Sequence, residues 1–291
     1  MKILVTGANG FVGSYLMPKL AQDGHVLCAL VHRHTSSIAE YVTKLTLDDL
    51  KASNETFDAI INLAGANIGA KRWTKDRKNL LRTSRIDFTK RLIEALPNIP
   101  SIWLNASAVG YYGNDDHKAF TEDTPANTGF THTLCEDWEN VALSANADRT
   151  VIFRLGVVLG KGGVLDKMLL PYKLGLGSKI GSGRQFFPWI HVNDVCSFIQ
   201  SALGDDSFHG TYNLVSPDVT DQAYFSKSLA QALNRPHVLW TPACALEMAL
   251  GEMGTLITKG QKVIPQRLTA RHFQFQYPEL NHALNAVLAP D

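Results

Sequence analysis

Three glycines follow the first apolar run of the chain, and their spacing constrains the fold more than any other feature of the sequence. Residues 2–6 (KILVT) predict a β-strand, and Gly7, Gly10 and Gly13 come next, where a helical pattern begins. In such a strand–turn–helix unit, glycines permit a tight turn, a close approach of backbone to a pyrophosphate and tight packing of helix on strand. The alternative is an ordinary glycine-rich turn. The strand before and the helix after it favour a dinucleotide-binding loop.

Short apolar runs alternate with helical segments through the first half of the chain. Beyond the first strand, we expect β-rich runs at residues 25–33, 59–65, 101–107 and 150–160. Near-continuously apolar strands separated by helices predict an α/β fold, a Rossmann-like doubly wound parallel sheet covered on both faces. The expected nucleotide-binding domain covers residues 1–160, with a contribution from about 190–215. A smaller mixed α/β domain for substrate covers residues 161–291.

The second region has a different texture. Residues 161–189 are rich in glycine, lysine and aromatic side chains, and we expect loops that shape a ligand site rather than another regular β-α unit. A helix at 191–203, a strand at 209–215 and a helix at 224–234 are predicted next. Residues 251–284 suggest a packed helix with a basic face, formed by Lys259, Lys262, Arg267 and Arg271.

Composition argues against several classes of partner. The 28 Lys and Arg residues against 27 Asp and Glu leave a net charge of +1, too weak to attract nucleic acid or an anionic membrane. No apolar run has the length of a membrane-spanning helix or of a signal-peptide core. The four cysteines form no C-x-x-C pair, and the histidines lack metal-ligand spacing, which argues against disulfides and metal. We expect a cytoplasmic protein.

Several segments resemble the short-chain dehydrogenase/reductase superfamily, and in particular its extended, epimerase-like branch. They are Asn62-Leu63-Ala64-Gly65 after an apolar strand, NASAVGYYG at residues 105–113 and FPWIHVNDV at residues 187–195. The likeness extends over essentially the whole chain to the epimerase-like oxidoreductases with a short family-specific C-terminal domain, here about residues 240–291. That subgroup has no securely assigned reaction. Some members carry a cell-division-inhibitor label, which no feature of this sequence supports.

The end of the second strand indicates which nicotinamide cofactor binds. Val31-His32-Arg33-His34 lacks the acidic residue that would accept a ribose 2′-hydroxyl, and Arg33 offers a bidentate partner for a 2′-phosphate. NADP(H) is therefore expected, unless Arg33 is only a solvated cation. Together with the resemblance, this predicts cofactor binding by Gly7, Gly10, Phe11, Val12, Gly13, His32, Arg33, Leu63, Ala64, Gly65, Arg85 and Val157.

The resemblance also raises a catalytic problem. Active members of the superfamily use Ser, Tyr and Lys, and Ser107 occupies the serine position. Counting back from Glu139 places Thr131 and Cys135 where Tyr and Lys are expected, and neither can perform that proton transfer. Tyr111 or Tyr112 takes the role, another group or the substrate supplies the proton, or the protein binds cofactor without turnover. Either tyrosine is equally consistent with a core aromatic. Acidic neighbours disfavour Cys135 as a nucleophile.

The substrate is expected between the two domains. A basic cluster would suit a small anionic substrate or form a solvated loop; it comprises Lys161, Lys167, Lys173, Lys179 and Arg184. Aromatic residues would wall a planar substrate or bury the loop; they are Phe186, Phe187 and Trp189. We expect Asp194, near His191, to cap the following helix.

Two functions follow from these observations. The leading hypothesis is an NADP(H)-binding oxidoreductase or nucleotide-sugar epimerase-like enzyme with a non-standard catalytic centre. The alternative is a non-catalytic NADP(H)-responsive regulatory protein. The sequence allows an oligomer and names no substrate.

Overall fold

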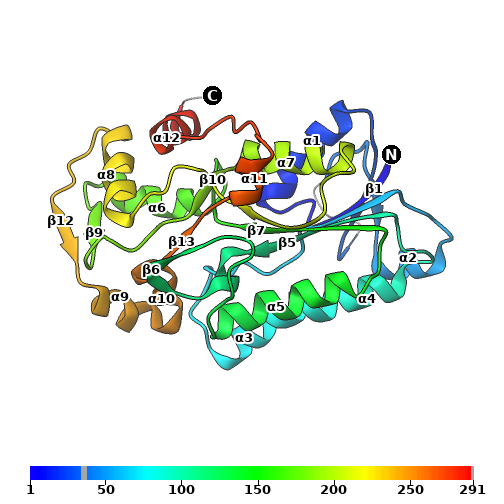
Figure 1. Ribbon diagram of the computed structural model, residues 1–291, viewed down its shortest axis with the longest axis horizontal. Coiled ribbons are helices and arrows are strands. Elements are labelled where there is room, and N and C mark those ends of the chain that lie inside the picture. Colours follow the sequence, from blue (N-terminus) through cyan, green and yellow to red (C-terminus); the bar gives the residue numbers. More distant parts are fainter. Residues whose placement is uncertain (34–37, 290–291) are drawn as a thin grey trace.

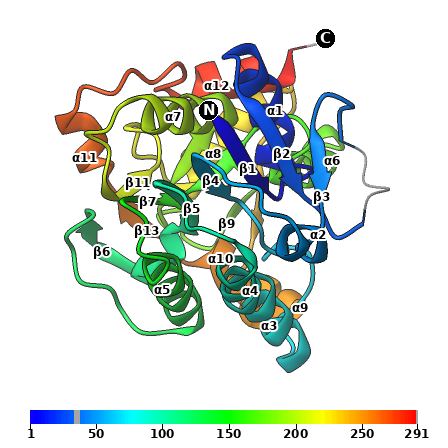
Figure 2. The ribbon, with the colours of Figure 1, turned by 90° about the vertical axis from the view of Figure 1, so that its right-hand side faces the viewer.

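Seven parallel strands form the central sheet of the computed structural model, which describes residues 1–33 and 38–289, without the side chains of 116 and 117. The strand order is β11-β7-β5-β4-β1-β2-β3 (Figures 1 and 2). The strands are β1 (Lys2–Thr6), β2 (Val26–Leu30), β3 (Thr43–Leu45), β4 (Ala59–Asn62), β5 (Ile102–Ala108), β7 (Arg149–Leu155) and β11 (Gly210–Leu214). The direction of winding reverses between β1 and β4, where doubly wound sheets bind their ligands.

Helices cover both faces of this sheet, as Figure 1 shows. One face carries α1 (Phe11–Gln22) and α7 (Val192–Gly204), which pack against each other. The other carries α2 (Leu47–Ala52), α3 (Lys75–Arg82), the π-helical turn η1 (Thr83–Asp87), α4 (Phe88–Ala95) and α5 (Phe130–Leu143). Along β1, Ile3 and Val5 enter one core while Leu4 enters the other, so consecutive positions of the strand are buried on both faces of the sheet. This burial explains the near-continuous apolar runs.

The remaining strands pair in three small parallel sheets outside the central one. The pairs are β8 (Val157–Leu159) with β10 (Trp189–His191), β9 (Ser178–Ile180) with β12 (Leu239–Thr241), and β6 (Asp115–Phe120) with β13 (Gln261–Val263). The other helical elements are the 3₁₀ turns η2 (Val109–Tyr112) and η3 (Gly251–Gly254), and α6 (Val164–Lys173), α8 (Gln222–Ala232), α9 (Ala243–Leu250), α10 (Thr255–Thr258), α11 (Gln266–Ala270) and α12 (Leu280–Leu288). Across the described ranges, no helix combines the length and hydropathy needed to span a bilayer.

The doubly wound parallel sheet predicted from the sequence is confirmed, and two expectations about the second region are wrong. Residues 164–173 form α6, not a loop, because Leu165 and Tyr172 are buried in the same small core. Residues 251–284 do not form one packed helix. Gly260, Pro265 and Pro278 interrupt the segment, which contains η3, α10, β13, α11 and the start of α12. Strand β11 joins the central sheet beside β7, and the predicted domain limits stay a prediction.

A third expectation fails at the start of α7. Asp194 does not cap this helix; His191 does, because its Nδ1 accepts the N–H of Asn193 at 3.2 Å. The buried Asp194 carboxylate instead accepts the N–H groups of Gln276 at 2.5 Å and Tyr277 at 3.2 Å. Desolvation of this carboxylate raises its pKa. Asp194 thus ties the chain segment before α12 to α7.

We predict that His191 makes folding stability pH-dependent. Burial lowers its pKa from 6.5 to about 4, so between these values the unfolded chain binds a proton that the folded chain does not. Stability should therefore fall, by about 1–2 kcal/mol, as the pH is lowered from 7 to 5. In His191→Asn, which keeps a capping oxygen, urea unfolding should show a shallower loss over that range. An unchanged slope in this variant, with the exposed His209→Asn as control, would contradict the assignment.

Candidate functional site

The turn after β1 leaves room for glycine alone at two positions. Gly7 has φ of +68°, and a Cβ there would lie 2.8 Å from the carbonyl oxygen of Leu63. A Cβ at Gly13 would lie 2.4 Å from the oxygen of Gly7, because α1 packs directly on the turn. The N–H of Gly10 donates to the same Gly7 oxygen at 2.9 Å and closes the turn. The spacing read from the sequence therefore reflects two close backbone approaches.

The N-terminus of α1 is open to an anion. Gly10 is its N-cap, no described side chain caps it, and its first turn contains no acidic residue. The first N–H groups of a helix lack intrahelical acceptors and carry a partial positive charge, and those at Phe11 and Val12 belong to this turn. The Phe11 ring packs where Cβ atoms at Gly160 and Gly163 would lie, 3.0 and 2.7 Å from its Cζ. The glycine-rich turn before α6 thus packs on the Phe11 side chain.

The end of β4 is held by buried polar groups. Thr6 donates its hydroxyl to Asn62 Oδ1 at 2.6 Å, and Asn62 donates its amide to Asn105 Oδ1 at 2.7 Å. The backbone N–H of Ala64 donates to Thr6 Oγ1 at 3.2 Å. These bonds join the carboxyl ends of β1, β4 and β5 and keep the half-buried Leu63–Ala64 backbone against Gly7.

Arg85 lies on η1, and its guanidinium packs beside Gly65. A Cβ on Gly65 would come within 2.9 Å of the guanidinium carbon. Arg85 Nη1 donates to the carbonyl oxygens of Ala66 at 3.1 Å and Leu81 at 3.2 Å, and the guanidinium lies 5.2 Å from the Trp138 ring centroid. Burial lowers its pKa. Short π-helical turns inside α-helices are frequent at functional sites.

The other predicted cofactor residues also lie at carboxyl ends of strands. His32 and Arg33 are exposed and follow β2, whose last residue, Leu30, pairs with Thr6 at the end of β1. The next residue of that motif, His34, lies outside the described residues. Val157, just after β7, is half-buried and donates its N–H to the oxygen of Pro188 at 2.8 Å.

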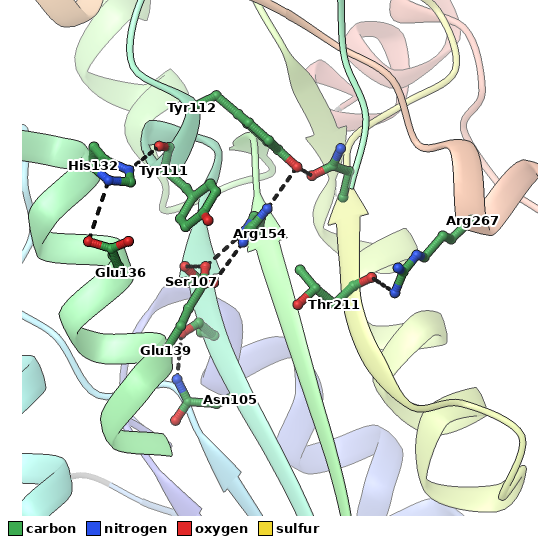
Figure 3. A network of polar contacts seen from close by, with 12 residues as sticks. Asn105, Ser107, Tyr111, Tyr112, His132, Glu136, Glu139, Arg154, Thr211 and Arg267 are labelled. Atoms are coloured by element: carbon green, nitrogen blue, oxygen red, sulfur yellow. Dashed lines mark hydrogen bonds and ion pairs between the residues drawn. The ribbon is translucent and has the colours of Figure 1, made fainter. Parts of the chain in front are cut away.

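A buried ion pair occupies the place where the sequence predicts catalysis. Arg154 on β7 binds Glu139 on α5 with two bonds, Nε to Oε1 at 2.9 Å and Nη2 to Oε2 at 2.8 Å. Ser107 on β5 donates its hydroxyl to Glu139 Oε1 at 2.5 Å (Figure 3). All three side chains are buried. The hydroxyl proton of Ser107 is therefore directed into the protein.

Tyr112 belongs to the same network and is fully buried. Its hydroxyl accepts Arg154 Nη1 at 2.9 Å and donates to Asn213 Oδ1 at 2.7 Å. Desolvation raises its pKa. With no exposed surface and both hydrogen-bonding directions used, this tyrosine acts as the buried aromatic that the sequence left as an alternative.

Tyr111 is placed differently. The turn η2 keeps it half-exposed, with its ring centroid 3.3 Å from the guanidinium carbon of Arg154 (Figure 3). His132 Nδ1 donates to the Tyr111 carbonyl oxygen at 2.7 Å, and His132 Nε2 lies 3.5 Å from Glu136. The Tyr111 hydroxyl has no hydrogen-bond partner in the described part of the chain. Of the two tyrosines, only Tyr111 offers its hydroxyl to a ligand.

Thr131 and Cys135 lie on α5 beside η2 and Ser107. A Cβ on Gly110 would approach the Cβ of Thr131 to 3.1 Å. Burial, followed by the charge of Glu139, raises the pKa of the Cys135 thiol to about 11. A thiol that stays protonated near neutral pH is a poor nucleophile, as the sequence predicted.

The substrate-side candidates lie on different elements. The basic residues from Lys161 to Arg184 are exposed and spread over α6, β9 and the adjoining turns. Phe187 packs on Phe225 with ring centroids 4.1 Å apart, and Trp189 is 1% exposed. These two aromatics bury the loop. Phe186 is half-buried, and Lys262 lies 5.8 Å from its ring centroid.

Sequence reasoning missed Arg154 as a site residue. A single charge inside the apolar run 150–155 was the available signal, since a buried cation needs an anion nearby. Glu139 served to count positions and as an acidic neighbour of Cys135, and the sequence does not pair it with a buried cation. The network forms only in the folded sheet, where the pairing of β5 with β7 aligns Ser107 with Arg154.

Comparison with known proteins places this geometry in a family. Residues 3–214 match the model of the NAD dependent epimerase/dehydratase family, and residues 241–287 match a domain of unknown function, DUF1731. The chain belongs to the NAD dependent epimerase/dehydratase family. Epimerase family protein SSP1921 of Staphylococcus saprophyticus is 38% identical over 97% of both chains. Human epimerase family protein SDR39U1 is 37% identical over 99% of this chain and its own full length.

Two solved structures share this fold. The crystal structure of human SDR39U1 (isoform 2) with NADPH has a TM-score of 0.90 at 34% identity and covers 99% of both chains. UDP-glucuronic acid 4-epimerase from Bacillus cereus, solved with UDP-glucuronic acid and NAD, has a TM-score of 0.79 at 18% identity and covers 99% of this chain and 98% of its own. The second likeness concerns the fold alone.

We predict that Glu139→Gln strongly destabilises the protein. It leaves the buried Arg154 without a counter-charge, which should lower the free energy of unfolding by about 3–5 kcal/mol in urea titrations. The matched control is Asp137→Asn on the same helix, which removes the exposed pair with Arg82 and should cost about 1 kcal/mol or less. Similar losses of unfolding free energy in both variants would show that the buried pair contributes no more to stability than the exposed pair.

Proposed function

We propose that the protein is an NADP(H)-binding oxidoreductase or epimerase-like enzyme with a non-standard catalytic centre. The observation that carries this proposal is the β1–α1 turn, where Cβ atoms are excluded at Gly7 and Gly13 and the helix N-terminus is open to an anion. The NADPH-bound structure of a relative at 34% identity over nearly the whole chain supports it.

The residues fit a dinucleotide laid across the carboxyl ends of the strands. Gly7, Gly10 and Gly13, with the N–H groups at Phe11 and Val12, would hold the pyrophosphate. Arg33 and His32 would take the 2′-phosphate on the β2 side. The nicotinamide half of the dinucleotide would be lined by Leu63, Ala64, Gly65, Arg85 and Val157. When bound, the nicotinamide supplies or accepts the hydride.

We assign proton transfer to Tyr111. Its hydroxyl is accessible and unpaired in the described part of the structure, and the Arg154 guanidinium packs on the face of the ring. Ser107 cannot donate to a substrate while it donates to Glu139. Tyr112 supports the network from inside. The substrate is a small molecule that reaches Tyr111 from the exposed side of η2.

Two observations favour the alternative, a non-catalytic NADP(H)-responsive protein. The Ser107 hydroxyl is bound inside the protein, and the positions matched by count to Tyr and Lys are Thr131 and Cys135, whose thiol stays protonated. Such a chain would keep the cofactor groove without the usual acid and base. Turnover separates the two functions.

We predict that cofactor binding depends on the glycine turn and on Arg33. Gly10→Asp places a carboxylate beside the pyrophosphate site and should weaken NADPH binding at least about tenfold, roughly 1.4 kcal/mol. Arg33→Glu should weaken NADPH to a similar degree and leave NADH unchanged. Calorimetric titration of nucleotide-free protein measures both. The exposed Lys51→Glu is the charge control, and unchanged NADPH affinity in the first two variants would overturn the assignment.

We predict that any turnover depends on Tyr111. In a screen of carbonyl and sugar-nucleotide substrates with NADPH, Tyr111→Phe should lower kcat about 100-fold or more and retain NADPH affinity. Tyr112→Phe should retain most of kcat and lose about 1 kcal/mol of stability with its hydrogen bonds. Tight NADPH binding without turnover of any substrate would support the regulatory alternative.

A further inference from the structure

Arg85 is a partly buried cation without a counter-ion. Among the described residues, no carboxylate lies within ion-pairing distance of its guanidinium, whose Nη1 bonds go to two backbone carbonyls. Glu139, on the adjacent helix, is already paired with Arg154 and accepts Ser107. Arg77 is a second cation near it, which adds repulsion. A buried charge that lacks a partner is costly, so its retention calls for a role.

Arg85 lies near the strand ends where the nicotinamide half of the cofactor is proposed to bind. Its guanidinium lies beside Gly65, just after β4, and the last residue of β4, Asn62, pairs with Asn105 of β5. Arg33 lies on the opposite side of the winding reversal, after β2. A dinucleotide whose 2′-phosphate binds at Arg33 therefore extends its nicotinamide half toward β4 and β5.

We propose that Arg85 sets the preference of the site for the reduced cofactor, by holding a positive charge beside the nicotinamide half of the groove. The inference rests on the proposed cofactor binding. The oxidised nicotinamide ring carries a positive charge and the reduced ring is neutral, so a fixed cation nearby disfavours NADP⁺ relative to NADPH. Arg85 belongs to the π-helical turn η1, and its guanidinium lies beside Gly65. It lies beside position 135, which the family resemblance matches with a lysine and which is a neutral thiol here.

The test compares the dissociation constants of the two redox forms. In wild-type protein, NADPH should bind more tightly than NADP⁺. Arg85→Gln should lower the ratio Kd(NADP⁺)/Kd(NADPH) about fivefold or more, because NADP⁺ gains relative affinity when the cation is removed. Arg85→Lys keeps the charge and should keep the ratio. Arg82→Gln, three residues earlier and exposed, should leave both constants unchanged.

Each other outcome has a distinct meaning. A parallel loss of affinity for both forms in Arg85→Gln, with an unchanged ratio, would show that Arg85 binds a phosphate or only supports the fold, and would overturn the proposal. Thermal unfolding of each variant identifies loss of structure, and Arg85→Lys keeps the comparison decisive if Arg85→Gln does not fold. Wild-type protein that binds neither form would overturn the proposed function, and this inference with it.

Discussion

The buried pair between Arg154 and Glu139 is the interaction on which the centre of the molecule depends. It joins β7 to α5, receives the Ser107 hydroxyl from β5 and, through Tyr112, reaches Asn213 on β11. Asn213 in turn donates its amide to the carbonyl of Ile264, next to β13. One guanidinium thus connects three strands of the sheet, the helix beside them and the C-terminal region. A pair this deep stabilises only because almost all of its polar atoms are bonded.

The same pair changes what the carboxyl edge of the sheet can do. By accepting the Ser107 proton it withdraws that hydroxyl from ligands, and by supporting the ring of Tyr111 it presents a different hydroxyl. The turn after β1 has the glycine geometry of a dinucleotide site. The glycine turn and the network around Ser107 thus lie at the same edge of the sheet and are held by separate sets of contacts.

The limits of sequence reasoning follow from the range of each interaction. The glycine turn and the long apolar strands were predictable because backbone sterics and two-sided burial act on neighbouring residues. Strand β3 was not, since its three residues form no apolar run. Glycines on both sides of α6 concealed a helix that is defined by two buried side chains. Tyr111 and Tyr112 are adjacent in sequence, and only the backbone of η2 decides which enters the core. Asp194 resembled a helix cap because its partners lie more than 80 residues away.

The place of β11 in the sheet has a consequence for how the chain is made. The chain leaves the sheet after β7, forms β8, α6, β9, β10 and α7, and only then returns to add β11 along the exposed edge of β7. During synthesis, the edge of β7 therefore stays unpaired until residue 214 has emerged, and such edges are aggregation-prone in unfinished chains. The central sheet is therefore complete only after residues 156–209, which lie between β7 and β11, have been made.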